Sequence, residues 1–318
     1  MERTDWVWMD GGLVPWEEAR IHVATDAVLQ GDNVFEGIRA YWNDEQQELF
    51  VFRNQAHLHR LRQSAKIMRL TIPYSDAELT AASNELLRAN AFHDHVHFRI
   101  VAYFGEGERG AWTPDKVRTG VFMLAQLSPH AAAVFEGVNS CTSTWRRLSD
   151  LSSPPRVKSG ANYHNSRFAR MEALLNGFDH PIMLNERGKV SETPGSCFFM
   201  LRDGIPATPP VTADILESIT RTTLIQLFRD EQNIEVQERE IDRTEVYLAD
   251  EAFLCGTGEE IRPVLSVDHY ELGYGNIGPV TQRLQKRYFD IVEGRVQKYS
   301  SWLTPVYQSA ALAAPVKH

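Results

Sequence analysis

Short strand signals joined by turn residues constrain the fold of this chain more than any other feature. Residues 6–9 are hydrophobic and lead into Asp10-Gly11-Gly12, a combination typical of a β-hairpin turn. Because several strand signals are joined by turns rather than by a steady strand–helix–strand repeat, the pattern favours an α+β (mixed α/β) fold over a doubly wound parallel sheet. Further strands are predicted at residues 49–52, 96–103, 121–127, 138–145, 181–184, 198–201, 234–237 and 252–255.

Helical patterns fall between these strands. Ser75 and Glu78 have the spacing of a capping box, which predicts a helix start. Helices are also predicted at 57–70, 163–175, 220–230 and 279–292, and residues 181–201 predict two strands paired around a turn at 185–188. The 318-residue length predicts two domains, namely a small N-terminal α/β domain at 1–127 and a larger C-terminal domain at 137–318, joined by a connector at 128–136.

The charge balance and the cysteine content argue against several classes of function. The formal net charge is −9 and the sequence pI is about 5.7, which disfavours a nucleic-acid partner because such a partner needs a basic surface. No apolar run reaches membrane-spanning length. The three cysteines form no CxxC pair, so we expect neither a metal site nor a disulfide framework, and we expect a reducing cytoplasm.

Lys158 suggests chemistry most directly. It follows Pro154-Pro155 and precedes Ser159-Gly160-Ala161, whose small side chains leave room for a flat ring. A lysine amine can form a Schiff base, a carboxylate such as Glu192 can hold a proton on a pyridine nitrogen, and Tyr163 could donate to a phenolate oxygen. Those groups are what pyridoxal 5'-phosphate (PLP) chemistry needs. Taken singly, each is more often an ordinary surface or helix-face residue, so the prediction depends on their combination.

A phosphate group would also find ligands in this sequence. Ser218-Ile219-Thr220-Arg221 opens a helix, whose N–H groups and dipole attract an anion. Cys255-Gly256-Thr257-Gly258 follows a strand and offers a small turn with a hydroxyl, and Arg60 could supply a forked charge. A serine at a helix start is usually only a cap, so these features indicate a phosphate site only in combination with Lys158. Together they predict PLP as the cofactor.

The order of these motifs resembles the class IV (fold-type IV) PLP-dependent aminotransferases, and most closely the branched-chain amino acid aminotransferases. The resemblance runs from about Trp6 to Gly294, nearly the whole chain. It is carried by residues 14–19 (VPWEEA), 34–41 (VFEGIRAY), 57–61 (HLHRL), 158–163 (KSGANY), 190–192 (VSE), 219–221 (ITR) and 247–257 (YLADEAFLCGT).

This resemblance implies a two-domain fold like that of the D-amino acid aminotransferases, with the cofactor between the domains, and a homodimer or higher homo-oligomer. Lys158 would be the Schiff-base lysine, Glu192 the partner of the pyridine nitrogen and Tyr163 the partner of the phenolate oxygen. The residues implied to hold the phosphate are Arg60, Ile219, Thr220 and Thr257. Those implied to lie near the substrate are Phe35, Gly37, Arg99, Thr257 and Gly258.

The implied activity is transfer of an amino group from a branched-chain amino acid to a 2-oxo acid such as 2-oxoglutarate, in a ping-pong cycle through Lys158. Two departures concern the substrate: Gln30 stands where these enzymes usually carry a tyrosine, and His97-Phe98-Arg99-Ile100 replaces their usual Tyr-x-Arg-Pro. Arg109, in a glycine-rich loop, is either a carboxylate ligand or an ordinary loop arginine. An (R)-amine or D-amino acid transaminase is therefore the alternative, followed by an aminodeoxychorismate lyase and a non-catalytic binding protein.

Overall fold

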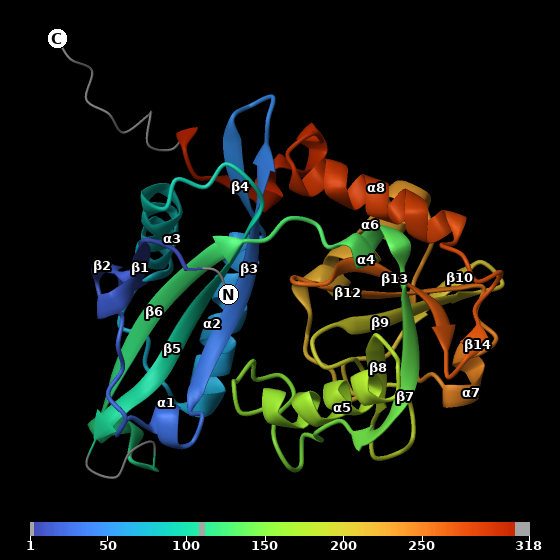
Figure 1. Cartoon of the computed structure of the whole chain (residues 1–318), viewed down its shortest axis with the longest axis horizontal. Helices are drawn as coiled ribbons and strands as arrows, with labels where there is room; N and C mark the ends of the chain where they lie inside the picture. Colours follow the sequence, from blue (N-terminus) through green and yellow to red (C-terminus); the bar gives the residue numbers. More distant parts are fainter. Residues whose placement is uncertain (1–2, 108–111, 309–318) are drawn as a thin grey trace. The chain divides into compact units, whose positions relative to one another are not determined.

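The computed structural model describes residues 3–107 and 112–308 of the chain, which form two compact units, each with its own sheet (Figure 1). Unit 1 contains the chain up to His130, the short segment Val157–Ala161 and the chain from Phe289 onwards. Unit 2 contains Ala131–Arg156 and Asn162–Tyr288. Helices pack with sheets that are mainly antiparallel, which confirms the predicted α+β class.

The sheet of unit 1 is antiparallel and has seven strands in the order β15-β4-β3-β5-β6-β1-β2. The first two strands form the predicted hairpin, in which Gly11 adopts a φ of 114° that favours glycine. The strands are β1 (Trp6–Met9), β2 (Gly12–Pro15), β3 (Asn33–Asn43), β4 (Glu48–Phe52), β5 (Val96–Gly107), β6 (Val117–Leu127) and β15 (Leu303–Pro305).

Two amphipathic helices, α2 (Asn54–Met68) and α3 (Asp76–Ala89), cover one face of this sheet (Figure 1). Their buried leucines pack against alternate residues of β3, β5 and β6, so the residues between those alternates face the other side. Ser75 and Glu78 form the predicted capping box. The short helices of this unit are η1 (Trp16–Glu18), α1 (Asp26–Leu29), η3 (Pro114–Lys116) and η4 (Gln297–Trp302).

Unit 2 contains the second sheet, in the order β11-β10-β9-β12-β13-β7-β8, with β14 paired to β13. Its strands are β7 (Val138–Arg146), β8 (His180–Leu184), β9 (Cys197–Arg202), β10 (Ile205–Thr208), β11 (Gln237–Glu238), β12 (Glu251–Gly256), β13 (Glu260–Val267) and β14 (Tyr270–Glu271). Its helices are α4 (Ala132–Glu136), α5 (Tyr163–Leu175), α6 (Ile219–Gln232), α7 (Arg243–Val246) and most of α8 (Pro279–Val292). None of the described helices combines the length and the apolar character that a bilayer crossing requires.

The two units are not consecutive halves of the chain. The chain leaves unit 1 within the predicted connector 128–136, but two later segments fold with unit 1. Val157 is buried in the core of unit 1 and Ser159 bridges to Val34 at the open edge of β3. Near the C-terminus, β15 pairs with β4. Residues 157–161 and β15 belong to unit 1 because the strands with which they pair, β3 and β4, lie in unit 1.

Two local predictions were wrong. The strand predicted at 234–237 is reduced to β11, which begins at Gln237 and has two residues. The strands β8 and β9 were expected to pair with each other, but β8 pairs with β7, while β9 lies between β10 and β12. The turn at 185–188 is present, because Leu184 bridges to Val190. Local turn chemistry therefore fixed this turn but not the neighbours of the strands that flank it.

His180, at the start of β8, should make the stability of the protein depend on pH. Its side chain is buried between two guanidinium groups, with Arg170 Nη1 at 2.7 Å from Nδ1 and Arg262 Nη1 at 2.9 Å from Nε2. Burial, with added repulsion from both arginines, lowers the pKa of His180 to about 3. The unfolded chain takes up a proton at this residue below about pH 6.5 and the folded chain does not, so stability falls as the pH falls.

We expect the urea-unfolding free energy to decrease between pH 7 and pH 5, with about 2 kcal/mol of the loss due to His180. The variant His180→Gln should lose that share of the pH dependence. The same substitution at His59, which is exposed on α2, is the control and should keep the wild-type slope. An H180Q variant with an unchanged slope would contradict this assignment.

Candidate active site

Lys158 lies on a short extended segment at the edge of the unit 1 sheet. Its carbonyl oxygen accepts a hydrogen bond from the Phe35 amide at 2.9 Å, and its own amide donates to Ser64 Oγ at 3.2 Å. The bridge between Val34 and Ser159 puts Lys158 opposite Phe35. The Lys158 Nζ accordingly lies 4.9 Å from the centroid of the Phe35 ring. The main chain therefore fixes the predicted catalytic amine against β3.

Gly160, two residues after Lys158, packs against the side chain of Asn33, which leaves no room for a larger residue. Its amide donates to Asn33 Oδ1 at 3.1 Å, and an added Cβ would lie 2.9 Å from Nδ2 and Oδ1 of the same Asn33 side chain. The space beside Gly160 is therefore filled by Asn33. The expectation that small residues here leave room for a flat ring is not supported at this position.

One face of the unit 1 sheet gathers most of the predicted substrate residues. The register pairs Gly37 of β3 with Arg99 of β5, and cross-strand partners share a face. That face carries Phe35, Gly37, His97 and Arg99, on the side opposite α2 and α3. Arg99 Cζ lies 5.6 Å from the centroid of the Phe35 ring, and its side chain is exposed. Lys158 and Arg99 thus approach the same aromatic ring.

Arg60 is part of a buried charged cluster on α2. Its Nε and Nη2 donate to Oε1 and Oε2 of Glu36 at 2.8 and 2.7 Å. His57 Nδ1 lies 2.7 Å from the same Glu36 Oε2, and all three side chains are buried. The guanidinium fork predicted to hold a phosphate is therefore already oriented by a carboxylate of β3.

The charges in this cluster are balanced. Burial on its own would raise the pKa of Glu36, but the charge and hydrogen bonds of Arg60, helped by His57, lower it to about 2. Burial lowers the pKa of His57, with Arg60 adding to the effect, although Glu36 opposes it. At neutral pH the cluster therefore contains an ionised Glu36, a neutral His57 and a charged Arg60.

Glu192 is the centre of the corresponding group in unit 2. The residue is 4% exposed, and its Oε1 lies 2.7 Å from Arg147 Nη2 and 3.2 Å from the amide of Leu216. The strand-like run 190–192 lies beside β8, where the Met183 amide donates to the Glu192 carbonyl oxygen at 3.0 Å. Arg147 also donates to Ser166 Oγ at 3.2 Å, which fixes the guanidinium from a second side. A buried carboxylate is thus held rigidly with its charge compensated.

The start of α6 offers two hydrogen-bond donors to an anion. Ser218 Oγ caps the helix by accepting from the Arg221 amide at 3.2 Å. Within the part of the chain that the structure describes, the amides of Ile219 and Thr220 have no hydrogen-bond acceptor. These amides lie at the positive end of a 14-residue helix, which is a suitable place for a phosphate.

The remaining predicted residues are divided between the two units. Thr257 and Gly258 form the turn between β12 and β13, where an added Cβ at Gly258 would meet no described heavy atom within 4 Å. Tyr163 is the first residue of α5 and is 37% exposed. Unit 1 thus contributes Phe35, Gly37, Arg60, Arg99 and Lys158, and unit 2 contributes Tyr163, Glu192, Ile219, Thr220, Thr257 and Gly258. Arg109 lies outside the described residues.

Sequence reasoning missed the residues that hold the predicted ones in place. His57 could have been found, because its i, i+3 spacing to Arg60 puts both on one face of a helix. Arg147 had no local signal. Its position beside Glu192 depends on a tertiary contact, since the Arg147 amide donates to the Leu184 carbonyl oxygen at 2.9 Å.

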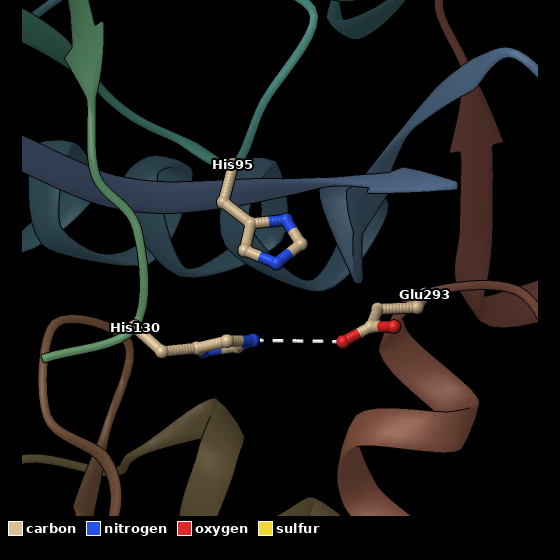
Figure 2. A group of neighbouring side chains, drawn as sticks. All are labelled: His95, His130 and Glu293. Atoms are coloured by element: carbon tan, nitrogen blue, oxygen red, sulfur yellow. Dashed lines mark ion pairs between the residues drawn. The ribbon is translucent and has the colours of Figure 1, made fainter. Parts of the chain in front are cut away.

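A separate group in unit 1 contains three possible metal ligands. Figure 2 shows His95, His130 and Glu293 pointing toward one another, with His130 Nε2 at 3.5 Å from Glu293 Oε1. However, His95 Nδ1 accepts a hydrogen bond from the Trp42 amide at 3.0 Å. A neutral imidazole has one lone pair, so Nε2 of His95 carries the proton and would have to lose it to bind a metal ion. We therefore interpret this group as a polar contact that ties the C-terminal end of α8 to β5.

Comparison with known proteins places the chain in a family. Residues 33–267, well over half of the sequence, match the family described as amino-transferase class IV. The chain is a class IV aminotransferase. The matched region includes every predicted cofactor residue of this aminotransferase, from Arg60 to Thr257.

The relatives of this aminotransferase are similar over almost their whole length. A probable branched-chain-amino-acid aminotransferase of Aquifex aeolicus is 39% identical over 303 residues, which cover 95% of this chain and 97% of that protein. The crystal structure of the branched-chain amino acid aminotransferase from Thermobaculum terrenum in its PLP form has 40% identity, a TM-score of 0.91, and coverage of 96% and 99% of the two chains. The structure from Escherichia coli has 36% identity, a TM-score of 0.91, and coverage of 96% and 100%. These matches confirm the predicted family and fold.

Proposed function

We propose that this aminotransferase uses PLP to move an amino group from a branched-chain amino acid to a 2-oxo acid such as 2-oxoglutarate. The observation that carries the proposal is the near full-length similarity to enzymes named for branched-chain amino acids. Retention of Lys158 and of a buried Glu192 supports it, because a non-catalytic relative would not need to keep both.

The residues present fit the cofactor. The two α6 amides without acceptors suit its phosphate, together with Thr257, and Arg60 would add positive charge oriented by Glu36. When bound, PLP supplies an electron-accepting ring that stabilises negative charge at the Cα of an amino acid. Glu192 would hold a proton on the ring nitrogen, and Arg147 keeps this carboxylate in one orientation. Tyr163 would donate a hydrogen bond to the phenolate oxygen.

Lys158 has two roles in the proposed reaction. Its amine would attach the cofactor covalently and, once displaced by the amino donor, would take the proton from the donor's Cα. The main-chain bonds to Phe35 and Ser64 hold the Lys158 backbone still during both steps, so that only the side chain has to move. The net result would be release of the donor as a 2-oxo acid with its amino group left on the cofactor, from which a second 2-oxo acid would receive it in a ping-pong cycle.

An (R)-amine or D-amino acid transaminase is the second candidate, and the departures at Gln30 and His97 favour it. Arg99 favours a donor with a carboxylate, since its guanidinium is exposed and no described carboxylate lies within ion-pair distance of it. We also propose a homodimer or higher homo-oligomer, which sedimentation would test. Cys141, Cys197 and Cys255 are buried and form no disulfide bond among the described residues, which suits a reducing cytoplasm.

The test is the visible absorption spectrum of the PLP-loaded protein before and after addition of L-leucine without a 2-oxo acid. We expect the yellow absorption to fall and that of the pyridoxamine form to rise. A yellow protein that ignores L-leucine but responds to a D-amino acid or an (R)-amine would shift the assignment to the second candidate. Release of pyruvate from aminodeoxychorismate without an amino acceptor would indicate a lyase.

A further inference from the structure

We propose that Thr193 is a positioning residue whose hydroxyl holds the turn between Glu192 and β9 in one shape. The turn would thereby set how far the Glu192 carboxylate lies from Thr257. This inference rests on the proposed function and deepens it, because Glu192 would bind the ring nitrogen of the cofactor and Thr257 its phosphate. All of these residues belong to unit 2.

The turn of residues 193–196 is closed by its main chain and by one side chain. The Thr193 amide donates to the Ser196 carbonyl oxygen at 2.9 Å, which makes residues 194 and 195 a two-residue loop. Thr193 Oγ1 accepts hydrogen bonds from the Ser196 amide at 3.0 Å and from the Gly195 amide at 3.4 Å. Because Pro194 has no N–H, this one oxygen binds both of the main-chain N–H groups that follow Thr193 in the turn.

Burial makes the turn depend on this hydroxyl. Thr193 and Ser196 are 1% and 4% exposed, and their two hydroxyl oxygens lie 2.6 Å apart. Removal of the Thr193 oxygen would leave the Ser196 amide without this acceptor, and leaving a buried polar group unpaired costs more than the hydrogen bond itself contributes. The turn would then have to change its shape to satisfy that amide.

One end of the turn is fixed to Glu192. A β-bridge joins Glu192 to Cys197, the first residue of β9. Partners in an antiparallel bridge carry their side chains on the same face, and Cys197 Sγ accordingly lies 3.9 Å from Glu192 Oε2. A change in the shape of the turn would therefore move the backbone from which the Glu192 carboxylate projects.

The other side of the turn packs against the chain that leads to Thr257. Strand β9, which follows the turn, pairs with β12 (Figure 1). Gly256 ends β12, and an added Cβ there would lie 3.1 Å from the Gly195 carbonyl oxygen and 3.3 Å from Ser196 Cβ. The turn thus occupies the space beside Gly256, and a displaced turn would displace the residue directly before Thr257.

The separation between the two contacts matters because one molecule has to make both. The ring nitrogen and the phosphate of PLP are joined covalently and keep a nearly constant distance. A carboxylate and a phosphate site therefore bind the same molecule well only when the protein holds them at a matching separation. A turn that touches both Glu192 and Gly256 is in a position to set that separation.

The test measures the binding of pyridoxamine 5'-phosphate, which has the ring and the phosphate of PLP but forms no Schiff base with Lys158. The full-length chain is freed of cofactor by dialysis and titrated by calorimetry. Thr193→Val keeps the shape of the side chain but removes its oxygen, so we expect Kd to rise about 10-fold. Thr193→Ser keeps the oxygen, and its Kd should stay within about twofold of the wild-type value.

The matched control is Thr281→Val. Thr281 is also 1% exposed, and its Oγ1 donates to Glu251 Oε2 at 2.7 Å near the start of α8. This variant likewise loses a buried hydroxyl hydrogen bond, so its thermal unfolding temperature should fall as that of T193V does. Its Kd should equal that of the wild type, because Thr281 does not contact the turn.

An unchanged Kd in folded T193V would overturn the proposal, and so would an equal rise in T193S or T281V. Thr193→Ala, for which we expect the same rise, would replace a valine variant that does not fold. Failure of the wild type to bind pyridoxamine 5'-phosphate would overturn the proposed cofactor as well. Binding by the wild type with the same Kd in T193V would instead remove only the role of Thr193.

Discussion

Replacing Lys158 with alanine should abolish transamination and leave the fold intact. The alanine variant has no amine to attach the cofactor or to take the Cα proton, and proton transfer alone contributes about 10²- to 10⁴-fold. We therefore expect kcat/KM for L-leucine and 2-oxoglutarate to fall by at least about 10⁴-fold. The segment should stay in place because its bonds to Phe35 and Ser64 are made by the main chain of Lys158.

Borohydride reduction followed by mass spectrometry gives an independent measurement of the same variant. Wild-type protein should retain the mass of one cofactor and K158A should not. The control is Lys189→Ala, which removes a lysine whose Nζ pairs with Asp242 at 2.7 Å on unit 2. Because such surface pairs contribute little, this control should keep its activity and its attached cofactor. Near-normal turnover by K158A would refute the proposed mechanism.

Replacing Glu192 with glutamine should lower both activity and stability. The variant keeps the shape of the side chain but loses the charge that would hold a proton on the ring nitrogen, so we expect kcat to fall by about 10²- to 10³-fold. It also leaves Arg147 buried without its 2.7 Å carboxylate partner, and breaking a buried ion pair costs about 3–5 kcal/mol. Both effects can be measured on one preparation, by half-reaction kinetics and by urea unfolding.

The matched control is Glu217→Gln at the Arg156–Glu217 pair, which has a similar N–O distance of 2.8 Å but side chains 41% and 48% exposed. Breaking this exposed pair should lower the free energy of unfolding by less than about 1 kcal/mol, because water already screens the two charges. If E192Q and E217Q lost equal stability, Arg147 and Glu192 would not form the strong buried contact described above. If E192Q kept wild-type kcat, Glu192 would not be the partner of the ring nitrogen.

Local features of the fold could be predicted where the responsible residues are close in sequence. The hairpin at Gly11, the capping box of Ser75 and the bounds of α5 and α8 depend on turn residues, caps and helical spacing within a few residues. The neighbours of β8 and β9 could not be predicted, because strand pairing joins residues that are far apart in the chain.

The candidate site, like the fold, could be predicted from the sequence only in part. Lys158 and Glu192 stand in motifs that can be recognised in the sequence, but their surroundings depend on tertiary contacts. Glu36 meets Arg60 because β3 packs under α2, and Arg147 meets Glu192 because the chain after β7 lies beside β8.

The return of the C-terminal segment to unit 1 has a consequence for synthesis on the ribosome. Strand β15 completes the sheet beside β4, and Glu48 Oε1 accepts hydrogen bonds from the amides of Val306 and Tyr307 across about 260 residues. The buried Glu48 carboxylate therefore lacks these donors until residues 306 and 307 have emerged. Synthesis of unit 1 begins before that of unit 2, but the sheet of unit 1 cannot be completed until β15 has been synthesised. Nascent chains stalled before residue 303 should therefore expose the edge of β4 to chaperones or to other chains.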